Sequence, residues 1–231
     1  PYKGELKGIA LVDPVEASGL LWVIEFATNS EQVNKQRSPW TNKLETEVAS
    51  NEFTVEDDGR YPGGIRSALA DDEGVKTSKR PIIEKGVLKS YIYDSYNANI
   101  ANAKATGNGF RRGTRSVEGA FTRPVACANS NLIIKPGNKT PKQIIGQIDK
   151  GVLVETFASP EVNPVTGGFS CEVRNATLIE KGQLTKHVKH ALLTGNMYEL
   201  LKNVAYVGND VRIVESFVLP TIAFDGTTLV G

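Results

Sequence analysis

Histidine and cysteine are scarce in this sequence, with two of each among 231 residues: His187, His190, Cys127 and Cys171. The histidines stand three positions apart in a stretch that reads as a strand, so their side chains are expected on opposite faces and not at one metal. Neither histidine is linked by sequence to a nucleophile, so no catalytic triad can be assembled. The cysteines lie in apolar or β-rich surroundings. This predicts buried free thiols in a reducing compartment, with a disulfide or a nucleophile as the alternatives.

An excess of charge and a long apolar run are also missing. The 27 Lys and Arg residues against 26 Asp and Glu residues give a net charge of +1. Because the basic residues are scattered and the aromatics are few, no nucleic-acid face is expected. No apolar run approaches the roughly 20 residues of a membrane-spanning helix. We therefore expect a cytoplasmic protein with neither a membrane nor a nucleic acid as a partner.

Methionine occurs only at Met197, and the sequence begins at Pro1. A translation product begins with methionine, so we expect a fragment or a trimmed part of a longer protein. The length is nevertheless sufficient to bury a core without a metal or a disulfide. The hydrophobic content of 40% is that of an ordinary globular domain.

The pattern of elements predicts an α+β fold. About ten strands and four helices can be assigned, with successive strands running in hairpins. Together they predict one large, mostly antiparallel or barrel-like sheet with a few flanking helices. The strand-like segments are residues 8–13, 46–59, 80–94, 152–158, 176–193 and 211–231.

The first helix carries the clearest start signal. Asp13 is predicted as the N-cap, Pro14 as the first helical residue and Glu16 as the partner in a capping box. The helix should run to about Asn29. The residues expected to share its buried face are Val15, Leu20, Leu21, Ile24 and Ala27.

Three further helices are predicted. Residues 95–109 should contain a short one. Thr140 caps another, which is expected to end at Gly151, and Asn196 caps the last, with Glu199 in its first turn.

The segment IEKGxL occurs twice, within residues 80–96 and 176–193. Each copy reads as the tip of a β-hairpin in which glycine follows lysine. Gly86 and Gly182 are therefore expected to adopt a positive φ.

Three acidic residues in a row, Asp71, Asp72 and Glu73, precede Gly74. Carboxylates can hold Ca²⁺ or Mg²⁺, but this spacing is not that of an EF-hand, and adjacent side chains point in different directions. A structural turn is favoured over a metal site.

A glycine-rich segment follows at residues 105–116, ATGNGFRRGTRS. It lacks the Gly-Lys-Ser/Thr of a phosphate-binding loop and does not lie between a clear strand and a helix. A loop whose arginines face a cleft or a partner is favoured over nucleotide binding. The residues of interest are Thr106, Gly107, Asn108, Gly109, Gly113, Arg111, Arg112 and Arg115.

The succession of three stretches resembles the TldD/PmbA family, also called TldE or modulator of DNA gyrase. The stretches are DDEGVKTSKRPIIEKGVLKSYIYDSYNA, then ATGNGFRR, then GVLVETFASPEVNPVTGGFSCEVRNATLIEKGQLTKHVKHALLTGNMYELLKNVAYVGND. Their order is similar to that in the C-terminal half of the family's proteins. The resemblance implies that residues 1–231 form a single C-terminal-type domain, with the family's N-terminal α/β domain absent from this chain.

In the resembling family, TldD is a zinc metallopeptidase that works as a heterodimer with TldE/PmbA on flexible peptides. It carries His-Glu-x-x-x-His on the first helix of this region and a cysteine near the C-terminus, groups that suit zinc chemistry. Aligned on RSPW and EVASNEFTVEDDG, the three motif positions fall on Leu21, Trp22 and Phe26, and no cysteine follows Cys171. The sequence therefore resembles the TldE/PmbA side, and we expect no metal, no cofactor and a packed, dry helix at this place.

The resemblance implies a non-catalytic or accessory member that pairs with a TldD-type subunit or with itself. Such a protein would support proteolysis of flexible peptides and would be inactive alone. The stretches at residues 71–74 and 106–109 are family-signature loops and candidates for a peptide cleft. Two alternatives stay open: a metal-independent hydrolase with Ser170 or Cys171 as nucleophile, and a pure protein-interaction module acting on gyrase.

Overall fold

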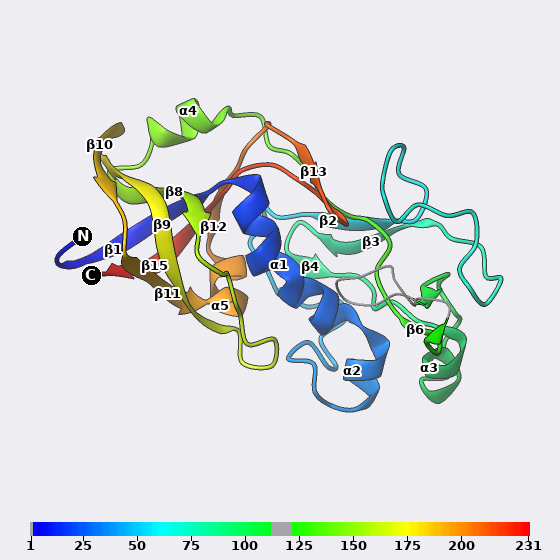
Figure 1. The fold of residues 1–231 in the computed structure, drawn as a ribbon. Helices are drawn as coiled ribbons and strands as arrows, with labels where there is room; N and C mark the ends of the chain where they lie inside the picture. Colours follow the sequence, from blue (N-terminus) through cyan, green and yellow to red (C-terminus); the bar gives the residue numbers. More distant parts are fainter. Residues whose placement is uncertain (1, 112–121) are drawn as a thin grey trace.

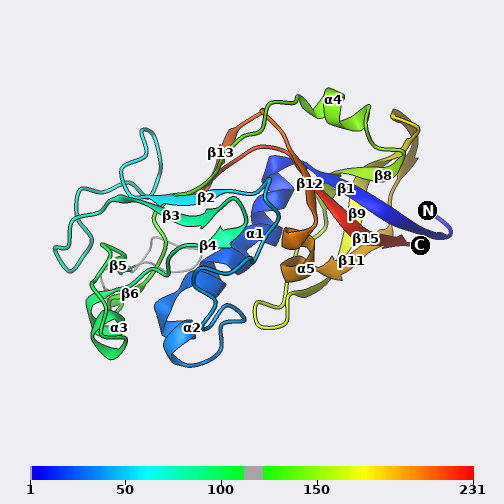
Figure 2. The same ribbon diagram turned by 180° about the vertical axis from the view of Figure 1, so that it is seen from behind.

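The computed structural model describes residues 2–111 and 122–231, which form two main sheets joined by a long helix (Figures 1 and 2). The predicted loop residues Arg112, Gly113 and Arg115 lie outside the described residues. Within the described part, no helix has the length and apolar character needed to cross a bilayer.

The larger sheet is closed into a ring. Its strands follow the order β1-β8-β9-β11-β15, and β1 pairs with β15 as well as with β8. Only the β1–β8 pairing is parallel within this sheet. The α+β fold with a mostly antiparallel, barrel-like sheet is thus confirmed. The strands are β1 (Glu5–Val12), β8 (Lys150–Phe157), β9 (Gly168–Glu180), β11 (Ala191–Asn196) and β15 (Ile222–Val230), with β10 (Gln183–Val188) on β9 and β12 (Val204–Val207) on β15.

The second sheet has six short strands in the order β13-β14-β7-β2-β3-β4. They are β13 (Arg212–Val214), β14 (Phe217–Leu219), β7 (Leu132–Ile134), β2 (Val55–Asp58), β3 (Lys79–Glu84) and β4 (Val87–Leu88). A separate pair is formed by β5 (Gly109–Phe110) and β6 (Ala126–Cys127).

Helix α1 (Pro14–Thr28) contacts both sheets, through β8 of the ring and through β13 and β14 of the second sheet. Its residues Leu20, Leu21 and Ile24 are buried in a core that also holds side chains of both sheets. Figure 1 shows the helix crossing the middle of the molecule between them. Because the buried face of α1 is almost wholly apolar, the helix can pack against both sheets.

The start of α1 is capped differently from the prediction. Asp13 is the N-cap, and its Oδ1 accepts a hydrogen bond from the Val15 amide at 2.9 Å. Glu16 does not close a capping box, because its carboxylate accepts instead from the amide of Phe157, the last residue of β8. Val15 was expected on the buried face and is 50% exposed, so that part of the prediction is wrong.

Both predicted hairpin tips are confirmed. Lys85 and Gly86 have φ of 46° and 82°, and Lys181 and Gly182 have φ of 50° and 76°. Two successive positive φ values are those of a type I′ turn. The second arm of the first hairpin is shorter than predicted, because after Leu88 the chain moves to the end of α1, where the Ile92 amide donates to the Thr28 carbonyl.

The predicted strand at residues 46–59 is correct only for β2. The preceding residues form turns that fold over the first hairpin tip, where the amides of Val48 and Ala49 both donate to the Gly86 carbonyl. The helix predicted from Thr140 to Gly151 is also shorter: α4 (Pro141–Ile145) has the capping box of Thr140 and Gln143, but Gly151 pairs in β8.

The other helices are α2 (Ser30–Asn34), α3 (Ser95–Ile100) and α5 (Met197–Lys202). Helices α3 and α5 were predicted, and Asn196 caps α5 as expected. Helix α2 was not predicted. The described residues contain fifteen strands and five helices, against the ten and four expected.

Candidate functional site

Leu21, Trp22 and Phe26 on α1 are the positions that the resemblance predicts to correspond to the zinc-binding motif. Leu21 is fully buried, whereas Trp22 and Phe26 are partly exposed, so the expected packing holds for Leu21 alone. Their side chains do not fit a zinc ion. Leucine and phenylalanine have no atom that could coordinate a metal ion. The indole nitrogen of tryptophan carries a hydrogen and can only donate a hydrogen bond, so it offers no electron pair to zinc.

The histidines and cysteines, which are common zinc ligands in proteins, do not lie together. All four histidines and cysteines are in the described part of the chain, which contains no group of three His, Cys, Asp or Glu residues able to hold a metal ion. His187 in β10 contacts the Thr177 hydroxyl, and His190, just beyond β10, contacts Glu172. Cys127 and Cys171 are free and buried, as predicted.

The two family-signature loops, far apart in sequence, pack against each other. The Gly109 amide donates to the Asp71 carboxylate at 2.9 Å, and the Asp72 amide donates to the Gly109 carbonyl at 2.9 Å. The Arg111 amide donates to the Asp72 carboxylate at 2.6 Å. Glu73 extends the contact to α3, accepting from the Ser95 amide at 2.7 Å. The three carboxylates therefore bind separate backbone amides and do not converge.

Gly107 lies against the backbone of residues 76–77, just after the first of these loops. It has φ of 77°, and a β-carbon there would lie 2.6 Å from the Lys76 carbonyl oxygen. A side chain would therefore meet both backbone strain and a fixed backbone atom.

Asn108 links the second loop to a buried carboxylate. Its Nδ2 donates to Asp57 at 2.8 Å and to the Ala128 carbonyl at 3.1 Å, while its Oδ1 accepts from the Thr106 hydroxyl at 2.6 Å. The Ser130 amide donates to the other oxygen of Asp57 at 2.7 Å. Burial raises the pKa of Asp57 to about 7, against the opposing effect of these two hydrogen bonds.

The polar atoms of residues 71–74 and 106–109 are thus largely used to hold the fold together. The turn favoured from the sequence for the acidic segment agrees with this geometry. Their part in a peptide cleft stays a prediction.

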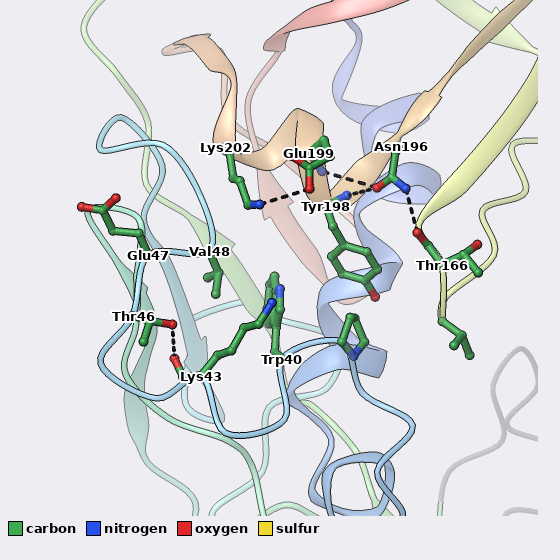
Figure 3. A pocket seen from close by; sticks show the side chains of 12 residues that line it. Trp40, Lys43, Thr46, Glu47, Val48, Thr166, Asn196, Tyr198, Glu199 and Lys202 are labelled. Atoms are coloured by element: carbon green, nitrogen blue, oxygen red, sulfur yellow. Dashed lines mark hydrogen bonds and ion pairs between the residues drawn. The ribbon is translucent and has the colours of Figure 1, made fainter.

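A pocket that the sequence did not reveal lies between residues 39–48 and α5 (Figure 3). It has a volume of about 420 Å³, in the range of small-ligand sites. Val165, Thr166 and Asn196 also line it. Because its walls come from segments more than a hundred residues apart, no local motif marks it.

Two aromatic residues at the pocket, Trp40 and Tyr198, are largely buried in the core. Trp40 and Tyr198 meet edge to face with ring centroids 5.8 Å apart. The Tyr198 hydroxyl donates to the Pro164 carbonyl at 2.6 Å and approaches the Val23 carbonyl of α1 at 3.5 Å. Burial raises the pKa of Tyr198, so this hydroxyl stays protonated. Tyr198 thus connects the pocket to α1, although no residue of α1 lines the pocket itself.

The two candidate nucleophiles do not form a site. Ser170 and Cys171 are successive residues of β9, so their side chains point to opposite faces. Cys171 is 1% exposed and its thiol faces the Glu161 carbonyl. Burial raises its pKa, which disfavours the thiolate that a nucleophile requires.

Comparison with known proteins shows which family this chain matches. Residues 9–231 match the model of the PmbA/TldA metallopeptidase C-terminal domain. The chain is 31% identical over 176 residues to a metalloprotease TldD homolog of Buchnera aphidicola, covering 76% of the chain and 35% of that protein. It is 31% identical over 212 residues to a metalloprotease of Methanocaldococcus jannaschii, covering 91% and 45%. The chain thus spans half or less of the length of these relatives.

Two solved structures are similar over the full fold. TldE from Thermococcus kodakarensis is 30% identical, with a TM-score of 0.87, and the match covers all of this chain and 51% of TldE. A Thermotoga maritima protein, named for a proposed role as modulator of a DNA gyrase, is 25% identical with a TM-score of 0.86, over 99% of this chain and 50% of that one. The chain therefore belongs to the PmbA/TldA metallopeptidase family.

Proposed function

We propose that this chain is a zinc-free, accessory member of the family that supports proteolysis by a TldD-type partner. The observation that carries the proposal is the set Leu21, Trp22 and Phe26 on α1, which offers no metal ligand where the resembling peptidases have His, Glu and His. A zinc peptidase needs three protein ligands and a metal-bound water that is activated for attack.

The similarity to TldE supports the same assignment, because TldE is the member expected to lack the metal. Pairing with a TldD-type subunit or with a second copy, binding of flexible peptides and a cytoplasmic location complete the proposal. An extended peptide could be held by backbone hydrogen bonds along a sheet edge, which gives affinity with little sequence preference.

Zinc content and partner-dependent peptidase activity test the proposal together. The purified chain is measured by elemental analysis, and hydrolysis of an unstructured peptide is followed with this chain, with the TldD-type protein of the same organism, and with both. We expect substoichiometric zinc and no hydrolysis by the chain alone, and faster hydrolysis by the pair than by the partner alone.

The control is a partner in which the Glu of its His-Glu-x-x-x-His is replaced by Gln. Hydrolysis by the mixture should then disappear, because all of the chemistry is assigned to the partner. Stoichiometric zinc bound by this chain's own residues, or hydrolysis that survives the partner's substitution, would overturn the proposal. In the second case Cys171→Ala would test the thiol alternative directly.

A further inference from the structure

Strand β10 has one edge with no strand beside it. Among the described residues, β9 is the only strand that pairs with β10, and no backbone hydrogen bond joins residues 183–188 to any other segment. The outer strands of the second sheet are better covered, since β13 contacts α1 and Val87 of β4 forms a bridge with Glu47. Figure 1 shows β10 at the end of the molecule that lies away from the second sheet. The outer edge of β10 therefore presents unpaired backbone groups to solvent.

This edge is held in place from the side of β9. The Thr185 hydroxyl donates to the Leu178 carbonyl at 3.4 Å, and the ring of His187 contacts the Thr177 hydroxyl at 3.1 Å. The pairing with β9 is irregular between Leu184 and His187, where β10 carries one extra residue. A bulge of this kind increases the local twist, so the outer edge fits a short added segment better than a long strand. A preformed edge also loses little conformational entropy on binding.

The chain around this edge is basic. Residues 181–190, KGQLTKHVKH, contain three lysines and no acidic residue. Lys181, Lys186 and Lys189 are all exposed, and none of them forms an ion pair with a described residue. Their ammonium groups therefore remain available to an anionic partner.

Acidic neighbours reduce this charge without cancelling it. The hairpin from Gly168 to His190 contains four basic residues and two acidic ones, a net charge of +2 with the histidines neutral. Of the two acidic residues, Glu172 contacts His190 at 3.2 Å, and Glu180 stands in register with Lys150 on β8. The excess positive charge thus lies on β10 and the residues that flank it.

Lysines on an edge strand commonly prevent pairing with other strands. Here they act against a particular kind of strand. A second copy of β10 would bring its own lysines against Lys181, Lys186 and Lys189, and like charges in contact are unfavourable. A strand with carboxylates meets attraction instead of repulsion, so the same side chains that exclude a second copy select an acidic one.

We propose that the outer edge of β10 binds a short acidic segment of an extended polypeptide as an added strand. The backbone of the segment would pair with the free edge, and its carboxylates would lie near the three lysines. Leu184, which is 48% exposed on the same strand, offers an apolar contact to a side chain between the carboxylates. The inference goes beyond the proposed function, because it holds whether or not a partner peptidase is present.

Three peptides test both parts of the inference. The peptides are Glu-Val-Glu-Val-Glu amide, Gln-Val-Gln-Val-Gln amide, and the acidic peptide with its three central backbone amides N-methylated. Each carries a neutral fluorophore, and binding is followed by fluorescence anisotropy at low salt. We expect the acidic peptide to bind roughly tenfold more tightly than the neutral one, the combined effect of several exposed ion pairs. The N-methylated peptide keeps the charge but loses hydrogen-bond donors, so it should bind roughly tenfold more weakly than its parent.

Hydrogen exchange locates the bound peptide. With the acidic peptide at saturation, the amides of residues 183–188 should exchange more slowly, because those at the outer edge become hydrogen-bonded. The amides of β13, at an edge of the second sheet, should exchange as they do in the free chain.

Matched variants separate this edge from general charge. Lys186→Gln should weaken binding of the acidic peptide roughly two- to fivefold and leave binding of the neutral peptide unchanged. Lys104→Gln is the control, because Lys104 is also exposed and lies just beyond α3, far from β10 in Figure 1. The control variant has the same net charge as Lys186→Gln and should bind both peptides as the unaltered chain does.

Four results would overturn the inference. They are equal binding of the acidic and neutral peptides, equal binding of the N-methylated peptide, protection that is absent from residues 183–188, and no binding of the acidic peptide at millimolar concentration. In the last case the lysines only protect the edge. These failures are distinct from failure of the proposed function, because zinc content and partner-dependent hydrolysis are measured without these peptides.

Discussion

Asp57 is the residue in which burial and hydrogen bonding oppose each other most clearly. The carboxyl group is 2% exposed and accepts from Asn108 and from the Ser130 amide. Both bonds favour the charged form, and so does nearby Arg80, while burial and Glu25 favour the neutral form. Burial is the largest effect and the pKa rises to about 7 from an ordinary 3.8. The Asp57 side chain thus joins the loop at residues 106–109 to β2, and its contribution to the free energy of unfolding depends on pH.

The sign of that dependence follows from proton binding. Between about pH 3.8 and pH 7 the folded chain keeps the Asp57 proton that the unfolded chain has released, so the free energy of unfolding falls as pH rises through this window. The slope from this one group is at most about 1.4 kcal/mol per pH unit. Asp57→Asn should remove it, so the variant gains stability relative to the unaltered chain as pH rises. Urea unfolding of both proteins at several values across the window measures the slopes, and parallel curves would contradict the assignment.

At the scale of elements, the contact between the loops at residues 71–74 and 106–109 depends on glycine for two separable reasons. Gly74 and Gly107 both have positive φ, of 79° and 77°. A β-carbon at Gly74 would meet nothing within 4 Å, whereas one at Gly107 would press on the Lys76 carbonyl. The first position requires conformational freedom only, and the second also requires the absence of a side chain.

The two glycines therefore form a matched pair of substitutions. Gly74→Ala should lower the free energy of unfolding by about 1 kcal/mol, the cost of left-handed backbone. Gly107→Ala should cost roughly 2–4 kcal/mol, because the clash with the Lys76 backbone is added to the same strain. Chemical denaturation of both variants checks the difference. Equal losses would mean that the loop at residue 107 moves away from residue 76 without penalty.

Elements with local chemical signals were predictable from the sequence. The Lys-Gly hairpin tips and the caps at Asp13, Thr140 and Asn196 are all decided within a few residues, and all formed as expected, whereas the capping box expected at Asp13 did not form. The local predictions are wrong where a distant segment competes for the same hydrogen-bonding groups. Glu16 bonds to β8 instead of to its own cap, and residues 46–54 fold over the Gly86 turn instead of extending β2.

At the scale of the whole molecule, closure and the pocket both depend on contacts that no short pattern contains. The ring closes because β1 pairs with β8 and β15, which lie more than a hundred residues later. The pocket joins Trp40 to Tyr198 across a similar separation. The family resemblance predicted the importance of the two signature loops and of the α1 positions. The pocket could be found only in the assembled structure.

The shared core predicts that the two sheets unfold together. Leu21 is 0% exposed in a core that spans both sheets, so Leu21→Ala should lower the free energy of unfolding by about 2–5 kcal/mol. Val15→Ala, on the same helix but 50% exposed, should change it by no more than about 0.5 kcal/mol. Native-state hydrogen exchange separates the sheets, with slow amides in β9 reporting on the ring and those in β7 on the second sheet. Because α1 contacts both, Leu21→Ala should accelerate both sets by the same factor. Acceleration confined to one set would show that the sheets are independent units and that α1 belongs to only one of them.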